Sequence, residues 1–406
     1  MRALFLTWDG NQQSYLESLF LPIFVRLREA GVEVHVLQFT WATEQEREPT
    51  RRAASAAGIP YTSQRISRRL GLPGQMAAIA SGARLARRYA RQHGIRVLFP
   101  RSLMPASMAL LAARFMPEAR IVFDADGLMA DERVDFAGWS ARGLPYRVLR
   151  DVEAETLRVA TSVITRTQAA KGILAARAGA ATDTAKIFVV PNAKDEQAFQ
   201  PGTAESRALT RARFGVPTDA PWLVYAGSLG PQYEPEALLD FFAKVRQRSP
   251  DARLLFFTFQ QQAFEALLQS RGLPRDAIEA RQAEPREVAA TLAAADLGLA
   301  LRRESFSQQA ICPIKVAEYL QCGVPVLSSR VGDLSEQIGS NDVAFLLSRT
   351  SADELERAAS WFLETVVPQR QAFRERCRRV GVEIFGIERC AEAYLKVFER
   401  SGGGLS

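Results

Sequence analysis

The stretch Glu304–Asp333 reads ESFSQQAICPIKVAEYLQCGVPVLSSRVGD, which predicts a polar loop, a helix and a strand in that order. Pro313 suits the start of a helix, and 324–328 is a short apolar run typical of a buried strand. A helix N-terminus presents unpaired N–H groups and the positive end of the helix dipole, both of which suit a phosphate. Lys315 lies in the first turn and Glu318 one turn later on the same face. Together they could bind a nucleotide-sugar diphosphate, through the lysine ammonium, and hydroxyl groups, through the glutamate carboxylate. The plainer alternative is a core helix that carries an exposed ion pair.

Strand and helix patterns alternate along the whole 406-residue chain. Apolar runs predict strands at 3–7, 32–39, 95–99, 120–123, 162–165, 186–190, 221–226, 253–258, 277–280, 297–301, 324–328 and 343–347. Helical patterns occupy 14–30, 105–115, 145–160, 167–178 and, without a break, 351–400. This alternation predicts an α/β protein with parallel sheets and right-handed crossovers. The polar stretch 192–221 marks a hinge between two domains.

Polar residues follow three of these strands at their carboxyl ends, where α/β sheets bind ligands. The first strand is followed by a turn that contains Gly10, Asn11 and Gln12. The strand 120–123 is followed by a loop that concentrates carboxylates around a glycine: Asp124, Asp126, Gly127, Asp131 and Glu132. The strand 221–226 runs into Gly227, Ser228 and Leu229. A glycine there lets the backbone approach a ligand, and the serine can donate to a phosphate. Ordinary polar turns and helix caps remain the alternative for each loop.

Composition narrows the class of protein, with 47% hydrophobic and 24% charged residues typical of a globular chain. The net charge of +7 is carried mainly by arginine, which favours anionic partners, although arginine-rich codon usage has the same effect. The cysteines at 312, 322, 377 and 390 show no CxxC spacing, so neither zinc nor a disulfide framework is indicated and a cytoplasmic setting fits. Asp9 interrupts the first apolar run before it can serve as a signal peptide, and no segment reaches the ~18 apolar residues of a membrane-spanning helix. No GxGxxG supports a dinucleotide cofactor.

The opening stretch resembles the donor-binding segment of GT-B glycosyltransferases, which have two Rossmann-like domains, and in particular the retaining family 4 group. The resemblance is carried by Pro313, Lys315, Glu318, Tyr319, Gly323, Pro325 and Val326. Val189-Val-Pro-Asn followed by Phe199 resembles the family's crossover between domains, and the Gly-Ser-Leu turn at 227–229 resembles the start of its second domain. The resemblance spans nearly the whole chain and is weakest over 40–100. It implies two domains that face each other across a cleft.

The resemblance also implies the domain bounds. Residues 1–195 would form an N-terminal acceptor domain and residues 196–385 a nucleotide-sugar donor domain. Residues 386–406 would form a final helix that crosses back to the first domain, followed by a flexible tail.

The implied reaction moves a sugar from a nucleotide-diphosphate sugar to a hydroxyl of a saccharide or lipid-linked saccharide, in cell-surface polysaccharide or glycoconjugate synthesis. Retention, independence of metal and the lack of any cofactor beyond the nucleotide-sugar co-substrate are implied as well. On the donor side, Lys315 would stabilise the departing diphosphate and Glu318 would hold the ribose, beside Gly227, Ser228, Leu229, Pro313 and Ile314. On the acceptor side, Asp126, Asp131 or Glu132 would bind the reacting hydroxyl, beside Gly10, Asn11, Gln12, Asp124 and Gly127. If the enzyme inverts, one of those three carboxylates is the candidate general base.

The sequence departs from the family pattern in ways that matter for the site. Ser228 and Gln232 stand where many relatives carry Arg and Lys, which leaves Lys315 as the main donor cation, with Arg302 or Arg303 as assistants. Ala310 stands where the partner of Glu318 in a glutamate pair is expected. Asp126 stands where some relatives carry Arg, and Asp124-Ala-Asp126 resembles the metal-binding DxD of the other glycosyltransferase fold, GT-A. The two histidines, His35 and His93, fit structural positions.

Two other functions remain open on these residues. A nucleotide-sugar 2-epimerase shares the two-domain layout, but the shortage of histidine near the sugar counts against it. A catalytically silent nucleotide-sugar-binding partner of a polysaccharide assembly complex is compatible with Ala310 and Asp126. Turnover separates the silent partner from an enzyme, whereas binding alone does not.

Residues 64–94 form a basic amphipathic segment. Its arginines are Arg65, Arg68, Arg69, Arg84, Arg87, Arg88 and Arg91, and apolar residues lie between them. Such a segment can lie on an anionic membrane surface and suits a lipid-linked acceptor, so peripheral attachment at the inner face of the membrane is expected. A solvated arginine face on a core helix is the alternative. Nucleic acid is not expected as a partner.

Overall fold

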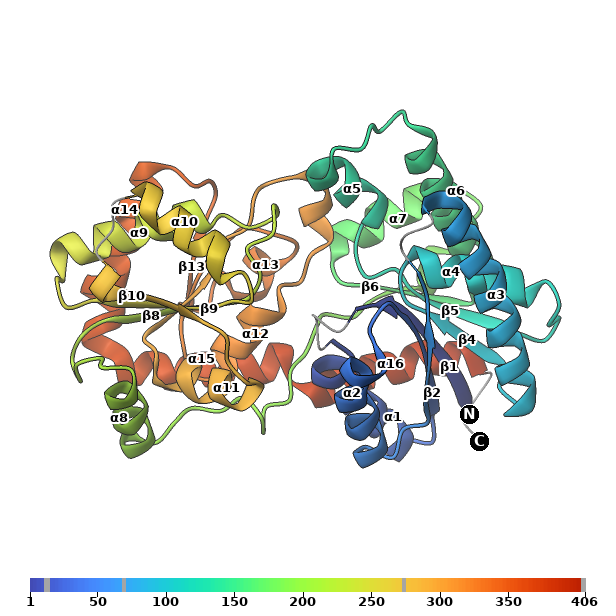
Figure 1. The fold of residues 1–406 in the computed structure, drawn as a ribbon, viewed down its shortest axis with the longest axis horizontal. Coiled ribbons are helices and arrows are strands. Elements are labelled where there is room, and N and C mark those ends of the chain that lie inside the picture. The colour runs from blue at the N-terminus through green and yellow to red at the C-terminus, as the bar shows by residue number, and fades with distance from the viewer. Residues whose placement is uncertain (11–14, 68–70, 272–274, 403–406) are drawn as a thin grey trace. The chain divides into compact units, whose positions relative to one another are not determined.

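A computed structural model describes residues 1–10, 15–67, 71–271 and 275–402, which form two compact units (Figure 1). Unit 1 comprises Met1–Pro191, Gln309–Ile311 and Ile387–Ser406, and unit 2 comprises Asn192–Gln308 and Cys312–Gly386. The unit bounds at 191/192 and 386/387 lie a few residues from the bounds 195/196 and 385/386 that the resemblance implies. The assignment of residues 309–311 to unit 1 has no counterpart in the sequence analysis.

Unit 1 is built on a seven-stranded sheet in the order β3-β2-β1-β4-β5-β6-β7. Its strands are β1 (Arg2–Asp9), β2 (Glu33–Thr40), β3 (Tyr61–Arg65), β4 (Val97–Pro100), β5 (Arg120–Asp124), β6 (Ser162–Thr165) and β7 (Ile187–Val189). All of the pairings between these strands are parallel. The strand order reverses between β1 and β4, and at such a switch point the carboxyl ends leave a crevice for ligands.

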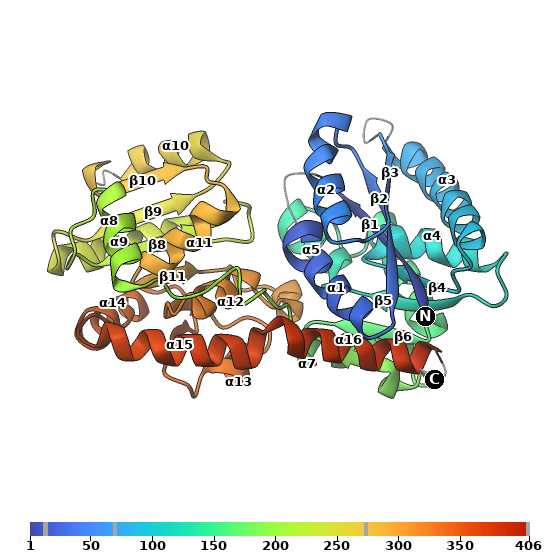
Figure 2. The same cartoon turned by 90° about the horizontal axis from the view of Figure 1, so that it is seen from below.

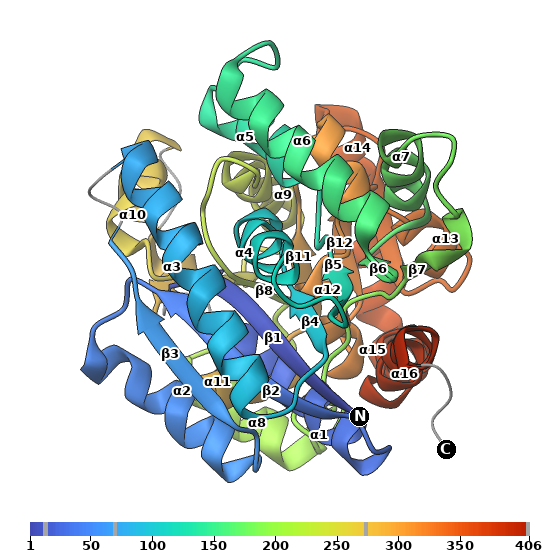
Figure 3. The same ribbon diagram turned by 90° about the vertical axis from the view of Figure 1, so that its right-hand side faces the viewer.

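The unit 1 sheet carries helices on both faces. They are α1 (Leu21–Glu29), α2 (Glu44–Ala56), α3 (Gly71–Gln92), α4 (Leu103–Ala113), α5 (Met129–Ala137), α6 (Leu144–Val159), α7 (Gln168–Ala178) and α16 (Ile387–Gly402). The helices α3, α4, α6 and α7 pack in sequence against one another, and Figure 3 shows α3, α4 and α6 along one face of the sheet. On the other face α16 packs against α1 and beneath β5 and β6 (Figure 2).

Unit 2 is built on a six-stranded parallel sheet in the order β10-β9-β8-β11-β12-β13, with its switch point between β8 and β11. Its strands are β8 (Trp222–Ala226), β9 (Arg253–Phe257), β10 (Ile278–Arg281), β11 (Leu297–Ala300), β12 (Val326–Ser329) and β13 (Ala344–Leu347). Its helices are α8 (Ala204–Arg213), α9 (Pro235–Arg248), α10 (Gln261–Arg271), α11 (Pro285–Ala294), α12 (Ile314–Gln321), α13 (Leu334–Ile338), α14 (Ala352–Ser360) and α15 (Arg370–Phe385). The helix α12 packs on α11 and α15, and α9 packs on α14. The predicted α/β class with two Rossmann-like sheets is confirmed.

The predicted helices differ from the structure in local detail. The helix predicted at 14–30 is confirmed over its described part, where a π-helical turn at Leu16–Phe20 leads directly into α1. The stretch 351–400 is not one continuous helix, because it contains a π-helical turn at Trp361–Val366, a 3-10 turn at Val367–Gln369 and an extended residue at Gly386. The proline at 368 cannot donate a backbone hydrogen bond, which accounts for the change of helix type.

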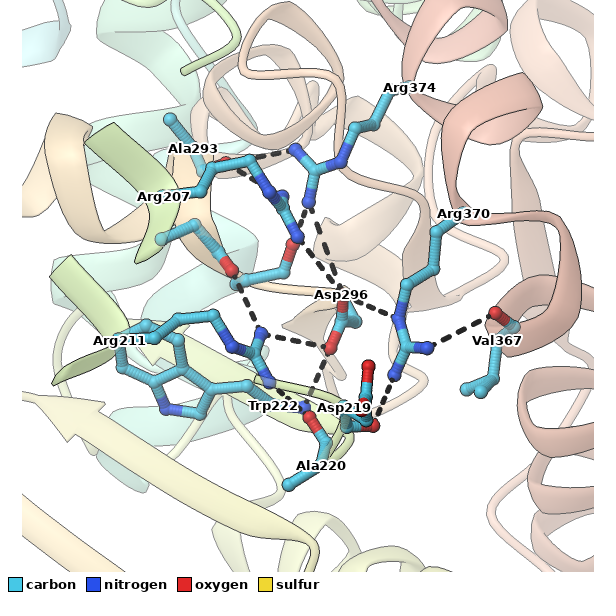
Figure 4. A network of polar contacts seen from close by, with 12 residues as sticks. Arg207, Arg211, Asp219, Ala220, Trp222, Ala293, Asp296, Val367, Arg370 and Arg374 are labelled. Atoms are coloured by element: carbon cyan, nitrogen blue, oxygen red, sulfur yellow. Dashed lines mark hydrogen bonds and ion pairs between the residues drawn. The ribbon is translucent and has the colours of Figure 1, made fainter. Parts of the chain in front are cut away.

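A buried charge cluster holds the base of the unit 2 sheet together. Asp296, which directly precedes β11, is completely buried and accepts a hydrogen bond of 3.0 Å from the backbone N–H of Trp222 at the start of β8. Four guanidinium groups surround its carboxylate, from Arg207, Arg211, Arg370 and Arg374 (Figure 4). Arg207, Arg211 and Arg374 also donate to backbone carbonyls at the C-terminal end of α11, the negative end of that helix dipole. Arg370 donates instead to the carbonyls of Val367 and Asp219.

Candidate donor and acceptor sites

The first turn of α12 places Lys315 at the switch point of unit 2. Pro313 precedes the helix, and no side chain caps its N-terminus. The Lys315 Nζ is shielded from solvent and has no hydrogen-bond partner among the described residues. It lies 4.1 Å from the ring centroid of Tyr225 and 4.3 Å from that of Tyr233. Burial lowers the pKa of Lys315 to about 8. A buried ammonium that lacks an acceptor is a group prepared for an anionic ligand.

The glycine turn after β8 lies directly against this lysine. Gly227 has a φ of +152°, and a Cβ there would stand 2.7 Å from Lys315 Nζ. The backbone of Ser228 accepts a hydrogen bond from the Tyr225 hydroxyl, and its own Oγ accepts from the N–H of Gly230 at 3.0 Å. The Leu229 N–H donates to Gln260 Oε1 at 2.6 Å. The structure therefore brings together Gly227 and Lys315, with Pro313 and Ile314 at the start of the same helix.

The two arginines predicted as assistants lie in different surroundings. The Arg302 guanidinium stands 4.7 Å over the Tyr233 ring, on the same tyrosine that Lys315 contacts. Burial would raise the pKa of Tyr233, but the positive charges of Lys315 and Arg302 outweigh burial and lower it. Arg303 instead lines a hollow beside α9 and α14 with Glu304. Arg302 is thus the one of the pair that adds positive charge near Lys315.

Glu318 lies one turn along α12 and is held by a partner that the sequence analysis missed. Its Oε1 is 2.8 Å from the Nζ of Lys194, and both side chains are largely buried. Tyr319, the next residue, donates to the carbonyl of Leu299 in β11. Nothing in the sequence pairs Lys194 with Glu318, because the two residues come together only when α12 folds over the chain that enters unit 2.

At the switch point of unit 1, β1 ends in a polar cluster around Asp9. Asp9 accepts hydrogen bonds from Thr7 Oγ1 at 2.8 Å and Gln38 Nε2 at 2.5 Å, and burial raises its pKa. Gly10 follows, close against the Trp41 ring. Asn11 and Gln12, predicted on the acceptor side, lie outside the described residues. Asp9 interrupts an apolar run in the sequence, and its place at a strand end is also a signal for a site residue.

The acidic loop after β5 divides its carboxylates between the interior and the surface. Asp124 is completely buried between Arg101 Nη1 at 2.9 Å and Arg166 Nη2 at 2.6 Å. Its other oxygen accepts the backbone N–H of Asp126, so both oxygens of Asp124 have partners inside unit 1 and its predicted acceptor-side role stays a prediction. Asp126 has a φ of +60° and pairs with Arg101 at 2.7 Å, while 41% of its side chain stays exposed. With two arginines on Asp124, the D-A-D motif is an ion-pair cluster rather than a set of open metal ligands.

Gly127 and the two remaining carboxylates complete the acidic loop. A Cβ at Gly127 would stand 3.8 Å from the Ile311 side chain. Asp131 is buried, with Arg177 Nη1 at 2.8 Å and the Tyr146 hydroxyl at 3.0 Å. Asp131 thereby links α5 to α6 and α7, and its predicted role at the acceptor hydroxyl stays a prediction. Glu132 is exposed in the first turn of α5.

The described residues contain no group of three or more His, Cys, Asp and Glu side chains that could hold a metal ion. They also contain no helix with the length and apolar character needed to cross a bilayer.

The two Rossmann-like units give the fold class of the GT-B glycosyltransferases, and comparison with known proteins gives two family matches. Residues 206–380 match the family model described as Glycosyl transferases group 1, and residues 23–197 match Glycosyltransferase Family 4. The two matches together cover most of the chain and identify it as a GT-B glycosyltransferase, as predicted from the sequence.

Relatives and solved structures agree with this assignment. The chain is 27% identical over 407 residues to a D-inositol 3-phosphate glycosyltransferase of Kineococcus radiotolerans, covering 94% of this chain and 89% of the relative. It is 30% identical over 213 residues to a GDP-mannose-dependent alpha-(1-6)-phosphatidylinositol dimannoside mannosyltransferase of Mycobacterium tuberculosis, covering 51% and 50%. The crystal structure of Anabaena Alr3699/HepE in complex with UDP and glucose shares the fold at a TM-score of 0.72 and 16% identity, covering 97% of this chain and 99% of that one.

Proposed function

We propose that this protein transfers a sugar from a nucleotide-diphosphate sugar to a hydroxyl of a saccharide or lipid-linked saccharide, with retention of configuration and without a metal ion. The observation that carries the proposal is the buried Lys315 ammonium, which has no hydrogen-bond acceptor among the described residues and lies against Gly227 at the switch point of unit 2. Relatives named for inositol 3-phosphate and for phosphatidylinositol dimannoside support an acceptor of the polyol or glycolipid class.

In this proposal unit 2 binds the donor. The diphosphate would be neutralised by Lys315 and by the positive end of the α12 dipole, which no side chain caps, and both would supply fixed positive charge as the diphosphate departs. The turn at Gly227 leaves room for the phosphates to approach the backbone, and Glu318 would accept hydrogen bonds from the ribose. Positioning and electrostatic stabilisation would then account for most of the rate enhancement.

Unit 1 would present the acceptor at the carboxyl ends of β1, β4 and β5. Asp126 and Glu132 remain the candidates for binding the reacting hydroxyl, because Asp124 and Asp131 are buried in ion pairs. Arg101 holds the Asp126 carboxylate in place. Asp9 adds a half-buried carboxyl group at the same sheet edge.

The proposal is tested by the melting temperature in EDTA with UDP, GDP, ADP and the corresponding nucleotide sugars. One nucleotide is expected to raise the melting temperature, since a ligand at 100 times its Kd stabilises the folded state by about 2.7 kcal/mol. Hydrolysis of the matching nucleotide sugar, or transfer to an acceptor, then separates the enzyme from a silent binding partner. A shift that requires a divalent ion would contradict metal independence, and no shift with any nucleotide would contradict the donor site.

We also propose that the layer of α3, α4 and α6 faces an anionic membrane. In unit 1 the large exposed apolar side chains of the described residues all lie on this layer or its connections: Met76, Phe115, Trp139, Leu144, Val148 and Val159. The sequence of α3 contains four arginines and no acidic residue, and Arg87 stands 5.2 Å over the exposed Phe115 ring. On the other face, α2 balances its arginines with Glu44 and Glu48. Of the predicted basic segment, Arg68 and Arg69 lie outside the described residues.

Sedimentation with vesicles checks this membrane proposal. The protein is expected to bind phosphatidylglycerol vesicles at low salt and to release them as salt rises. Leu144→Ser with Val148→Ser should weaken binding by about tenfold, because two exposed side chains on one face of α6 would no longer be buried in lipid. Leu209→Ser, at an equally exposed leucine of unit 2, is the control. Equal binding to neutral vesicles, or an equal loss with the control, would contradict the proposal.

A further inference from the structure

Two segments that join the units lie side by side just inside unit 2. The chain enters unit 2 at Asn192 and leaves it at Gly386. The backbone N–H of Lys194 donates to the carbonyl of Phe385 at 3.0 Å, and Lys194 and Gly386 form an isolated parallel bridge. The entering and leaving segments are therefore hydrogen-bonded to each other at this point.

The helix α12 fastens both segments. The Gln321 Nε2 donates to the carbonyl of Lys194 at 2.9 Å and to the carbonyl of Phe385 at 3.0 Å. Gln321 is completely buried, and it lies less than one turn after Glu318 on the same helix. At the other end of the helix, Asn192 Nδ2 donates to the carbonyl of Cys312 at 2.7 Å. One short helix thus carries the candidate diphosphate lysine, the candidate ribose carboxylate and the side chain that binds both junction segments.

Lys194 connects the junction segments to Glu318. Its backbone belongs to the junction, whereas its ammonium lies 2.8 Å from Glu318 Oε1. The lysine is 4% exposed and also stands 5.3 Å over the Phe199 ring. A surface ion pair holds a carboxylate loosely, but a buried ion pair of this kind fixes its rotamer and leaves the second oxygen available to a ligand.

We propose that Lys194 is a positioning residue of the donor site, which orients Glu318 toward the ribose and couples nucleotide binding to the junction segments. This inference rests on the proposed function of Glu318. Lys194 makes no contact with the nucleotide in this proposal and acts through the carboxylate that it holds. A ribose that binds Glu318 tightens the Glu318–Lys194 pair, and with it the hydrogen bonds of Lys194 and Phe385.

The test uses nucleotides with and without ribose hydroxyls. Kd is measured by calorimetry for UDP, GDP and ADP, and for the 2′,3′-dideoxy form of whichever binds. Wild type should prefer the ribose form by at least about tenfold, the usual value of a hydrogen bond to a charged acceptor. In Lys194→Met this preference should fall to near one, as in Glu318→Gln, whereas Lys194→Arg should restore much of it. Lys315→Met should weaken both forms equally and keep the preference.

Controls separate positioning from a loss of stability. Lys186 is another buried lysine, whose Nζ donates to the carbonyls of Arg158 and Ala160 at 2.8 and 2.9 Å, so Lys186→Met should leave the ribose preference unchanged. Hydrogen exchange at saturating nucleotide gives the second measurement. Amides around 192–196 and 384–388 should gain protection in wild type, and this gain should be absent in Lys194→Met.

The outcomes distinguish the inference from the function on which it rests. An unchanged ribose preference in Lys194→Met, with weaker binding in Lys315→Met, would overturn the role of Lys194 and leave the donor site standing. Unchanged affinity in Lys315→Met and Glu318→Gln would overturn both. A gain of junction protection that persists in Lys194→Met would overturn the coupling.

Discussion

Lys315→Met is expected to lower the rate of sugar transfer by about a hundredfold or more and, at the same time, to raise the melting temperature by about 3 °C. The ammonium is buried without a hydrogen-bond acceptor among the described residues, and methionine fills similar space without a charge. Removing it relieves a desolvation cost in the free protein but deprives the departing diphosphate of its main cation. Initial rates with the cognate nucleotide sugar and thermal melts of the same samples check both effects.

The pH dependence of nucleotide binding gives a second measurement on the same lysine. Burial lowers the pKa of Lys315 from its ordinary 10.5 to about 8, and a diphosphate favours the charged ammonium. Wild-type affinity should therefore hold below pH 8 and weaken by up to about tenfold per pH unit above it, while Lys315→Met should show no such decline. Lys244→Met removes a lysine of α9 that pairs with Glu356 at the surface, and it should change neither rate nor pH profile. Unchanged turnover in Lys315→Met would remove the donor assignment.

Sequence patterns over a few neighbouring residues predicted most of the central strands and the helix α12. The strands at the centre of both sheets are continuous apolar runs, and α12 follows from Pro313 and the apolar positions after it. The helix α2 and the strand β3 went unpredicted because their patterns are weak. In α2 only Thr50 and Ala54 are buried, and β3 is an edge strand with no fully buried residue.

The parts of the site that depend on distant partners could not be predicted. The carboxylates of the acidic loop look alike in the sequence. In the structure Asp124 is buried in ion pairs with Arg101 and Arg166, and Asp131 is buried in an ion pair with Arg177. Tyr233 contacts Lys315, and Lys194 pairs with Glu318. Both pairs are far apart in the sequence and meet only when the chain has folded. Periodicity reports which face of an element is buried, and it contains no information on which charged partner a buried side chain will meet.

Ala310 illustrates a departure from the family pattern that the structure explains. The sequence analysis noted an alanine where a glutamate partner of Glu318 is expected. Ala310 is completely buried and packs in the core of unit 1, and the neighbouring Gln309 carbonyl accepts a hydrogen bond from Thr167 Oγ1 at 2.7 Å. A carboxylate at this position would be buried in an apolar cluster, which accounts for the alanine.

Asp296→Asn is expected to destabilise unit 2 by about 3–5 kcal/mol, the usual cost of breaking a buried ion-pair network by removing one partner. The substitution keeps the size of the side chain but leaves four guanidinium groups around a neutral amide (Figure 4). It also weakens the acceptor for the Trp222 N–H, which ties the base of β11 to that of β8. Urea unfolding followed by far-UV circular dichroism measures the change, and hydrogen exchange assigns it to unit 2, since the two units can unfold in separate steps.

Asp240→Asn is the matched control for this prediction. Asp240 pairs with Arg271 on the surface of α9, with 47% of its side chain exposed, so its loss should cost less than about 1 kcal/mol. The contrast follows from solvation: water screens and replaces the surface pair, whereas no water reaches the completely buried carboxylate of Asp296. Similar midpoints for the two variants would show that the backbone carbonyls around the cluster satisfy the four arginines without Asp296, and the carboxylate would then be dispensable for the fold of unit 2.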